Sequence, residues 1–168
     1  MTSCLLLIDV QNGFVSEATE HVIPRIMSLD CGRFDHVVAS RFVNTEGSPY
    51  RRVMGWEKLS SPPETDLLPF VEEAVERVFV KNVYTMANRE FLDYLDCCGI
   101  DVVYLCGIDT DCCVLKTAVD LFELDRDVRV LEHYCASNGG LESHEAALKV
   151  MRRQISENCI VHGALPDS

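Results

Sequence analysis

The sequence predicts an α/β fold, a three-layer α-β-α sandwich in which helices cover both faces of a six-stranded, mainly parallel sheet. Short apolar runs alternate along the chain with longer segments of helical period, which is the pattern of parallel strands joined by helical crossovers. The apolar runs are almost uninterrupted, as expected of strands buried on both faces. No repeat, low-complexity tract or linker divides the chain, so we expect one domain over residues 1–168.

The expected elements follow in order along the chain. Strands are predicted at 4–8, 36–40, 78–80, 102–106, 128–131 and 159–161. Apolar residues at three- and four-residue spacing predict amphipathic helices within 71–78, 91–98, 114–122 and 147–155, with a weaker helix near 23–29. The stretch 42–63 is unusually long for a connection, and its aromatic residues predict an ordered, packed loop.

Charge and cysteine usage exclude several classes of protein. The chain has 27 acidic and 15 basic residues, a net charge of −12, which argues against binding to nucleic acid or to an anionic membrane. Nine cysteines occur without a secretory signal or a CxxC pair, so we expect reduced thiols in a cytoplasmic protein rather than disulfides or a structural zinc site.

Chemically useful side chains follow the predicted strands. Parallel sheets bind ligands at the carboxyl ends of their strands, where this chain has Asp9, Lys81 and the pair Cys112 and Cys113. A thiol at a helix start beside an ammonium group favours the thiolate, and a carboxylate can accept its proton. Backbone amides at the same helix start could bind an oxyanion. This set of groups suits acyl transfer.

Four segments with these residues resemble the isochorismatase-like cysteine hydrolases, which include nicotinamidases and carbamoylsarcosine amidases. The segments are 6–14, 80–84, 107–118 and 136–148, in the family's order across nearly the whole chain. The resemblance implies a catalytic triad of Asp9, Lys81 and Cys113, because the family's cysteine directly precedes a valine. It also implies a cis peptide bond between Ile108 and Asp109, which turns the Asp109 amide toward the oxyanion beside the Cys113 amide.

The resemblance implies hydrolysis of an amide-like C–N bond in a small molecule. The Cys113 thiolate would attack the carbonyl, ammonia or an amine would leave, and water would hydrolyse the thioester. Asp9 would move the protons, while Lys81 would hold Asp9 and favour the thiolate. The resemblance implies no cofactor, and because the family is often oligomeric we expect a homo-oligomer.

The chain departs from the family at positions that affect the substrate. Nicotinamidases have an Asp-x-His triplet and a further His as a metal site after the second strand, where this chain has Arg41-Phe42-Val43-Asn44. We therefore predict no catalytic metal, which argues against nicotinamide as the substrate. Arg41 could bind a substrate carboxylate or pair with a local acid, and Asp109 could accept a hydrogen bond in the pocket or tie down its loop.

Other assignments stay open. Candidate pocket residues are Phe14, Trp56 and Tyr84, although aromatic side chains also serve as core. One alternative function is that of an isochorismatase-type vinyl-ether hydrolase, in which the cysteine need not be the nucleophile. A second is a non-catalytic binding or redox-responsive protein that uses the vicinal pairs 97–98 or 112–113.

Overall fold

A computed structural model describes residues 1–166 and confirms the predicted α/β class. The strands pair in the order β3-β2-β1-β4-β5-β6, and every pairing is parallel. Their bounds are Ser3–Ile8 (β1), His36–Phe42 (β2), Arg77–Lys81 (β3), Val102–Ile108 (β4), Asp127–Ala136 (β5) and Ile160–Val161 (β6).

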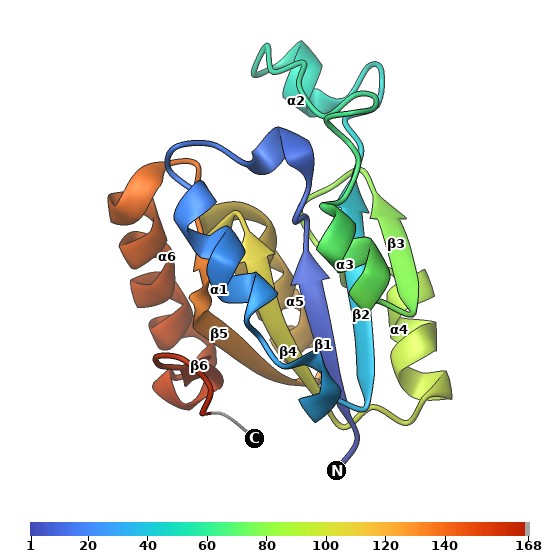
Figure 1. Cartoon of the computed structure of the whole chain (residues 1–168), viewed down its shortest axis with the longest axis vertical. Coiled ribbons are helices and arrows are strands. Elements are labelled where there is room, and N and C mark those ends of the chain that lie inside the picture. Colours follow the sequence, from blue (N-terminus) through green and yellow to red (C-terminus); the bar gives the residue numbers. More distant parts are fainter. Residues whose placement is uncertain (167–168) are drawn as a thin grey trace.

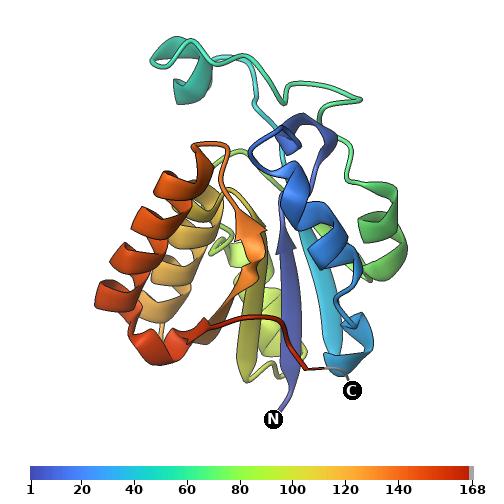
Figure 2. The same ribbon diagram turned by 60° about the vertical axis from the view of Figure 1, so that its left-hand side comes forward.

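Helices lie on both faces of the sheet. Their bounds are Ile23–Met27 (α1), Pro49–Arg52 (α2), Pro69–Ala74 (α3), Arg89–Cys97 (α4), Leu115–Glu123 (α5) and Gly140–Ile155 (α6). Figures 1 and 2 show α1 and α3 on one face of the sheet and α5 with α6 on the other. Right-handed crossovers account for this division. The chain first adds β2 and β3 on one side of β1, and then crosses to the other side of β1 to add β4, β5 and β6, so its later helices lie on the opposite face.

Two predicted elements have different bounds in the structure. The helix expected over 71–78 ends at Ala74, and Val75 is extended. Residues 77–81 instead pair with β2, so backbone hydrogen bonding in the sheet overrides the helical spacing of the apolar residues. The fifth strand is longer than predicted, because its pairing with β4 resumes after a register shift between Leu105 and Gly107.

The long stretch after β2 forms an ordered cap, which we define as residues 43–60. Figures 1 and 2 show this segment, with α2, standing beyond the carboxyl ends of the strands. Buried Tyr50 packs edge-on against Phe42, with ring centroids 5.3 Å apart, and Trp56 lies 5.9 Å from the same ring. Asn44 Nδ2 donates to the carbonyl oxygens of Trp56 and Lys58. The predicted packed loop is therefore confirmed.

Among the short elements at the sheet edge is a π-helical turn over Thr110–Val114, between β4 and α5. Within residues 1–166, no helix is both long and apolar enough to cross a membrane.

Candidate active site

The carboxyl ends of three strands bring the three predicted catalytic residues together. Asp9 directly follows β1, Lys81 is the last residue of β3, and Cys113 lies in the π-helical turn after β4. Lys81 Nζ lies 2.6 Å from Asp9 Oδ2 and 3.3 Å from Cys113 Sγ. All three residues are buried, with exposed fractions of 0%, 4% and 3% for Asp9, Lys81 and Cys113.

Backbone and side-chain groups fix the orientation of this cluster. Lys81 Nζ also donates to the carbonyl oxygens of Val83 and Tyr84, at 3.1 and 3.0 Å. Ser40 Oγ donates to Asp9 Oδ1 at 2.6 Å and accepts from the Asp9 amide at 3.1 Å. Asp9 has a φ of +51°, in the left-handed region that side chains other than glycine rarely adopt. The carboxylate is therefore held by its backbone, by Ser40 and by Lys81.

Burial and charge shift the pKa of two groups in the cluster. It raises the pKa of the Cys113 thiol well above its usual value, the charge of Asp9 raises it further, and Lys81 only partly opposes the shift. Burial alone would lower the pKa of Lys81, but Asp9 and the Cys113 sulfur outweigh it and the pKa is raised. Burial and the charge of Asp9 thus oppose the thiolate that the helix start and Lys81 favour.

The turn that holds Cys113 is tightly connected to the sheet and to α6. The Ile108–Asp109 peptide bond is cis, at the position the resemblance implies. Gly107 has a φ of +127°, and a Cβ there would lie 2.1 Å from the Ile8 carbonyl oxygen, so only glycine fits. The hydroxyl of buried Thr110 is 2.8 Å from His144 Nδ1 on α6.

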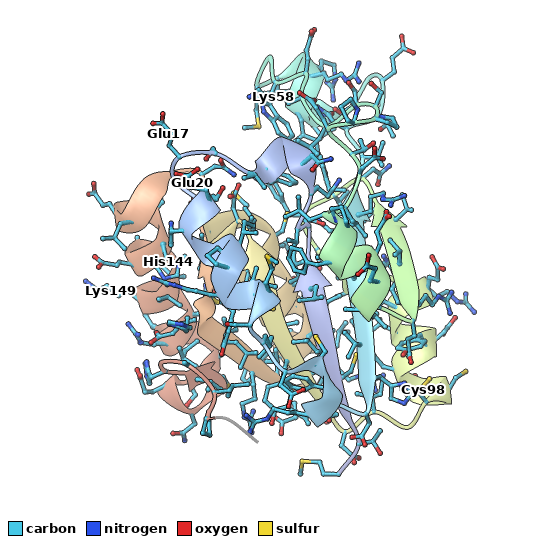
Figure 3. All side chains as sticks on the ribbon, viewed as in Figure 1. Glu17, Glu20, Lys58, Cys98, His144 and Lys149 are labelled. Atoms are coloured by element: carbon cyan, nitrogen blue, oxygen red, sulfur yellow. The ribbon has the colours of Figure 1, made fainter. Side chains whose placement is uncertain are left out.

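A cavity of about 500 Å³ opens above Cys113. It is lined by Gly13, Phe14, Phe42, Met54, Trp56, Lys58, Tyr84, Asp109, Cys112, Cys113 and Asn138. Figure 3 shows Lys58 on the cap, on the side where the strands end. The cavity thus lies between the sheet edge and the cap, and aromatic rings form much of its wall.

The structure separates the predicted pocket residues into two groups. Phe14, Trp56 and Tyr84 line the cavity. Arg41 lies outside the described wall of the cavity, and its Nη2 donates to Glu72 Oε1 at 2.8 Å. Its side chain thus makes the local ion pair that the sequence left as one of two possibilities, and we do not propose it as a substrate ligand.

Several residues of the site were not singled out from the sequence. Ser40 lies on β2 opposite Ile8 in the sheet register, so its position beside Asp9 depends on strand pairing. Asn138 donates from its backbone amide and from Nδ2 to Asp109 Oδ1, both at 2.8 Å. Lys58 and Met54 belong to the cap. The useful sequence signal for Ser40 was its position as the last residue of a predicted strand, whereas Asn138 follows β5 only because that strand extends to Ala136.

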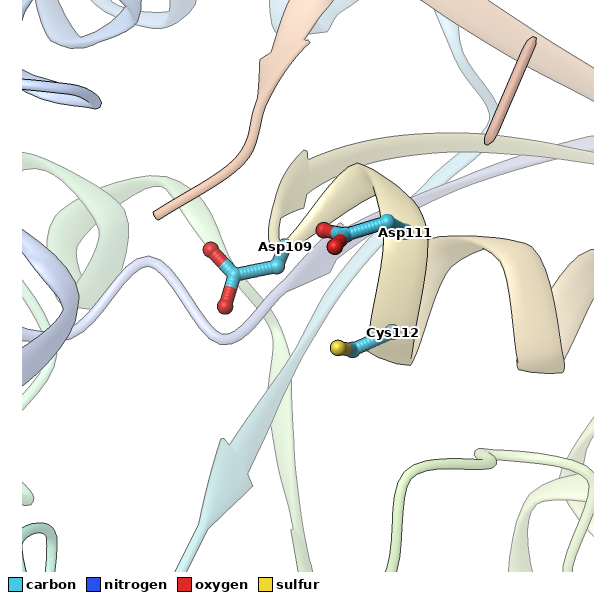
Figure 4. A group of neighbouring side chains, drawn as sticks. All are labelled: Asp109, Asp111 and Cys112. Atoms are coloured by element: carbon cyan, nitrogen blue, oxygen red, sulfur yellow. The ribbon is translucent and has the colours of Figure 1, made fainter. Parts of the chain in front are cut away.

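One group of side chains has the composition of a metal site. Figure 4 shows Asp109, Asp111 and Cys112 projecting from the same turn, and their ligand atoms lie within 4.8 Å of one another. Asp109 Oδ1 already accepts two hydrogen bonds from Asn138, and Asp111 Oδ1 accepts one from Ser137. After β2, the Asn44 side chain is committed to the cap backbone. The residues after β2 therefore do not fit the Asp-x-His metal site that the resemblance to nicotinamidases would place there.

Comparison with known proteins identifies the family of this chain. A family model described as an isochorismatase domain matches residues 3–160. A nicotinamidase/pyrazinamidase of Mycobacterium tuberculosis is 30% identical over 174 residues, which cover 88% of this chain and 93% of that protein.

Solved structures share the fold. A nicotinamidase from Bacillus subtilis matches with a TM-score of 0.84 at 23% identity, over 96% of this chain and 100% of that chain. An isochorismatase-like hydrolase from Alkaliphilus metalliredigens matches with a TM-score of 0.81 at 24% identity, over 92% of each chain. On the match over residues 3–160, the chain belongs to the isochorismatase family.

Proposed function

We propose that this protein hydrolyses the C–N bond of a small amide- or carbamoyl-type molecule, with Cys113 as the nucleophile. The observation that carries the proposal is the buried contact of Lys81 Nζ with both Asp9 and Cys113 at the wall of a cavity of about 500 Å³. The likeness to a nicotinamidase/pyrazinamidase, 30% identical over 88% of this chain, supports amide chemistry. The reaction needs no cofactor.

The first half of the reaction forms a thioester. Cys113 Sγ attacks the carbonyl carbon while its proton passes to Asp9, and the carbonyl oxygen becomes an oxyanion held by the Asp109 and Cys113 backbone amides. Asp9 then donates that proton to the leaving nitrogen as the C–N bond breaks. Ammonia or an amine departs, and the acyl group remains on sulfur.

The second half releases the acid. Asp9 takes a proton from water, the resulting hydroxide attacks the thioester carbonyl, and the C–S bond breaks. The proton returns from Asp9 to the Cys113 sulfur. Lys81 keeps its proton throughout and orients Asp9. The nine cysteines are all free, which fits a reducing compartment, and we therefore place the protein in the cytoplasm.

An ammonia-release screen of small amides, ureas and carbamoyl compounds tests this function. Cys113→Ala is expected to lose about a thousandfold or more of kcat/KM on any compound that the wild type cleaves. Cys97→Ala, which removes an exposed thiol on α4, is the matched control and is expected to retain activity. Mass spectrometry of the quenched wild type should detect an acyl group on Cys113.

Two results would contradict the proposal. Clean turnover by Cys113→Ala would remove the nucleophile and favour vinyl-ether hydrolysis on the same fold. An amide panel without turnover, together with reversible oxidation mapped to Cys112 and Cys113, would favour the redox-responsive alternative.

A further inference from the structure

We propose that Asp109 selects substrates that carry an N–H donor near the scissile carbonyl, such as an amino or ureido group. This inference rests on the proposed function, since it specifies the substrate class of the same cavity. Asp109 lines that cavity together with Cys112 and Cys113. Its carboxylate is the negatively charged group of the wall, beside the aromatic side chains Phe14, Phe42, Trp56 and Tyr84.

The carboxylate is held with one oxygen engaged and the other free. Oδ1 accepts hydrogen bonds from the Asn138 amide and from Asn138 Nδ2, both at 2.8 Å. Asn138 is itself fixed, because its Nδ2 also donates to the Phe14 carbonyl at 3.1 Å and its Oδ1 accepts from Ser16 Oγ at 2.7 Å. Within residues 1–166, Oδ2 of Asp109 makes no hydrogen bond. It therefore remains available as an acceptor.

The surroundings of the Asp109 carboxylate favour a donor beside it. In the described part of the chain Asp109 forms no ion pair, and Lys81 is committed to Asp9, Cys113 and two carbonyls. Lys58 on the cap is the positively charged group of the same wall, and it forms no ion pair with Asp109. Burial raises the pKa of Asp109 to about 6, so the group is a carboxylate at neutral pH. A half-buried anion with an open lone pair gains most from an N–H group placed beside it.

The competing explanation is that Asp109 serves only to connect loops through Asn138. Asp109→Asn separates the two roles. The Asn oxygen can keep both hydrogen bonds from Asn138, which orients its NH₂ group to the place of Oδ2. The loop connection is then retained, while the free group changes from an acceptor to a donor.

Isosteric pairs of compounds provide the test, one member with N–H and the other with a methyl or methylene group. The pairs are glycinamide with propionamide, phenylurea with phenylacetamide, and each aminobenzamide isomer with the corresponding methylbenzamide. We measure kcat/KM by ammonia release, and we measure the Kd of every compound for Cys113→Ala by calorimetry. In at least one pair the donor compound should be favoured by about tenfold to a hundredfold.

Asp109→Asn is expected to bring that ratio to one or below, both in turnover and, combined with Cys113→Ala, in binding. Asp111→Asn is the matched control, because Asp111 is on the same turn but outside the described wall of the cavity, and it should leave the ratio unchanged. Circular dichroism checks that each variant is folded.

The outcomes separate the two proposals. A ratio that Asp109→Asn leaves unchanged overturns this inference, as does the absence of any donor preference, including a failure of all donor compounds to bind. If Asp109→Asn weakens both members of each pair equally, Asp109 only connects the loops. If no compound releases ammonia but the Asp109-dependent binding preference is present, the proposed hydrolysis fails while the selectivity of Asp109 stands.

Discussion

Replacing Lys81 by methionine is expected to destabilise the fold far more than the loss of an ordinary ion pair. Methionine retains most of the side-chain volume but removes the ammonium that lies 2.6 Å from Asp9 Oδ2. Asp9 keeps its hydrogen bond from Ser40 and stays fully buried. The variant therefore contains a buried carboxylate without a compensating charge.

The magnitude follows from this burial. Removing one partner of a buried ion pair costs about 3–5 kcal/mol. The side chains of Lys81 and Asp9 are only 1% and 0% exposed, so water does not screen the remaining charge. The carbonyls of Val83 and Tyr84 lose a donor as well. We expect a loss of about 4 kcal/mol in the free energy of unfolding, which lowers Tm by about 8–16 °C in a chain of 168 residues.

Urea and thermal unfolding of Lys81→Met, Asp9→Asn and the double variant provide the assay. The double variant should be less destabilised than Lys81→Met by about 2 kcal/mol, because no orphaned charge remains. The raised pKa of Lys81 keeps it charged in the wild type between pH 5 and 8. The wild-type reference for these variants therefore contains the charged ammonium throughout that range.

Lys116→Met is the matched control, since it breaks the pair of an exposed lysine with half-buried Asp120 on α5 and should cost at most about 0.5 kcal/mol. A deficit for Lys81→Met within about 1 kcal/mol of this control would refute the reasoning. So would a double variant whose loss equals the sum of the two single losses.

Three further predictions concern other parts of the site, and the last has a control variant of its own. Burial raises the pKa of Asp109 from 3.8 to about 6, so the contribution of this carboxyl group to stability is full below pH 3.8 and is lost as the pH rises through 6. The Tm of Asp109→Asn should therefore rise relative to wild type at pH 8 but not at pH 4. A difference in Tm that does not depend on pH would contradict this. Ser40→Ala removes the hydrogen bond to Asp9 Oδ1 and should lower the free energy of unfolding in urea by about 1–3 kcal/mol and kcat by about tenfold. An unchanged kcat would mean that Ser40 does not orient Asp9. Gly107→Ala should lose more than about 4 kcal/mol or fail to fold, because its Cβ meets backbone at 2.1 Å. Gly99→Ala, with open space around the new methyl group, should cost only about 1 kcal/mol, and equal losses would show that strain rather than contact dominates.

The sequence predicted the sheet well because its strands are buried on both faces. Uninterrupted apolar runs such as 4–8 have no other stable position in a small α/β protein. The sequence failed where two patterns overlapped. Val75 and Val78 fit a helical stripe that begins near Pro69, but Val78 also fits a strand, and pairing with Ala39 decides between them. That pairing is a long-range interaction, which local spacing cannot reveal.

The candidate site was predictable to the extent that it follows strand ends. Asp9 and Lys81 come directly at the ends of apolar runs, and the sheet places them at one edge. Ser40 and Asn138 contact Asp9 and Asp109 only through strand register and loop packing. Arg41 also follows the strand-end rule, yet a neighbouring acid on α3 takes its guanidinium. The rule therefore identifies the edge of the sheet but not the direction of each side chain.

The raised pKa of Cys113 fits the proposed chemistry once the charges of the cluster are counted together. Release of the thiol proton to solvent would add a second buried negative charge beside Asp9, which the single positive charge of Lys81 cannot balance. Transfer of the same proton to Asp9 leaves one negative and one positive charge, as before. The buried surroundings therefore oppose a free thiolate but allow the internal transfer. In the proposed reaction, nucleophilic attack would then begin when a carbonyl reaches Cys113.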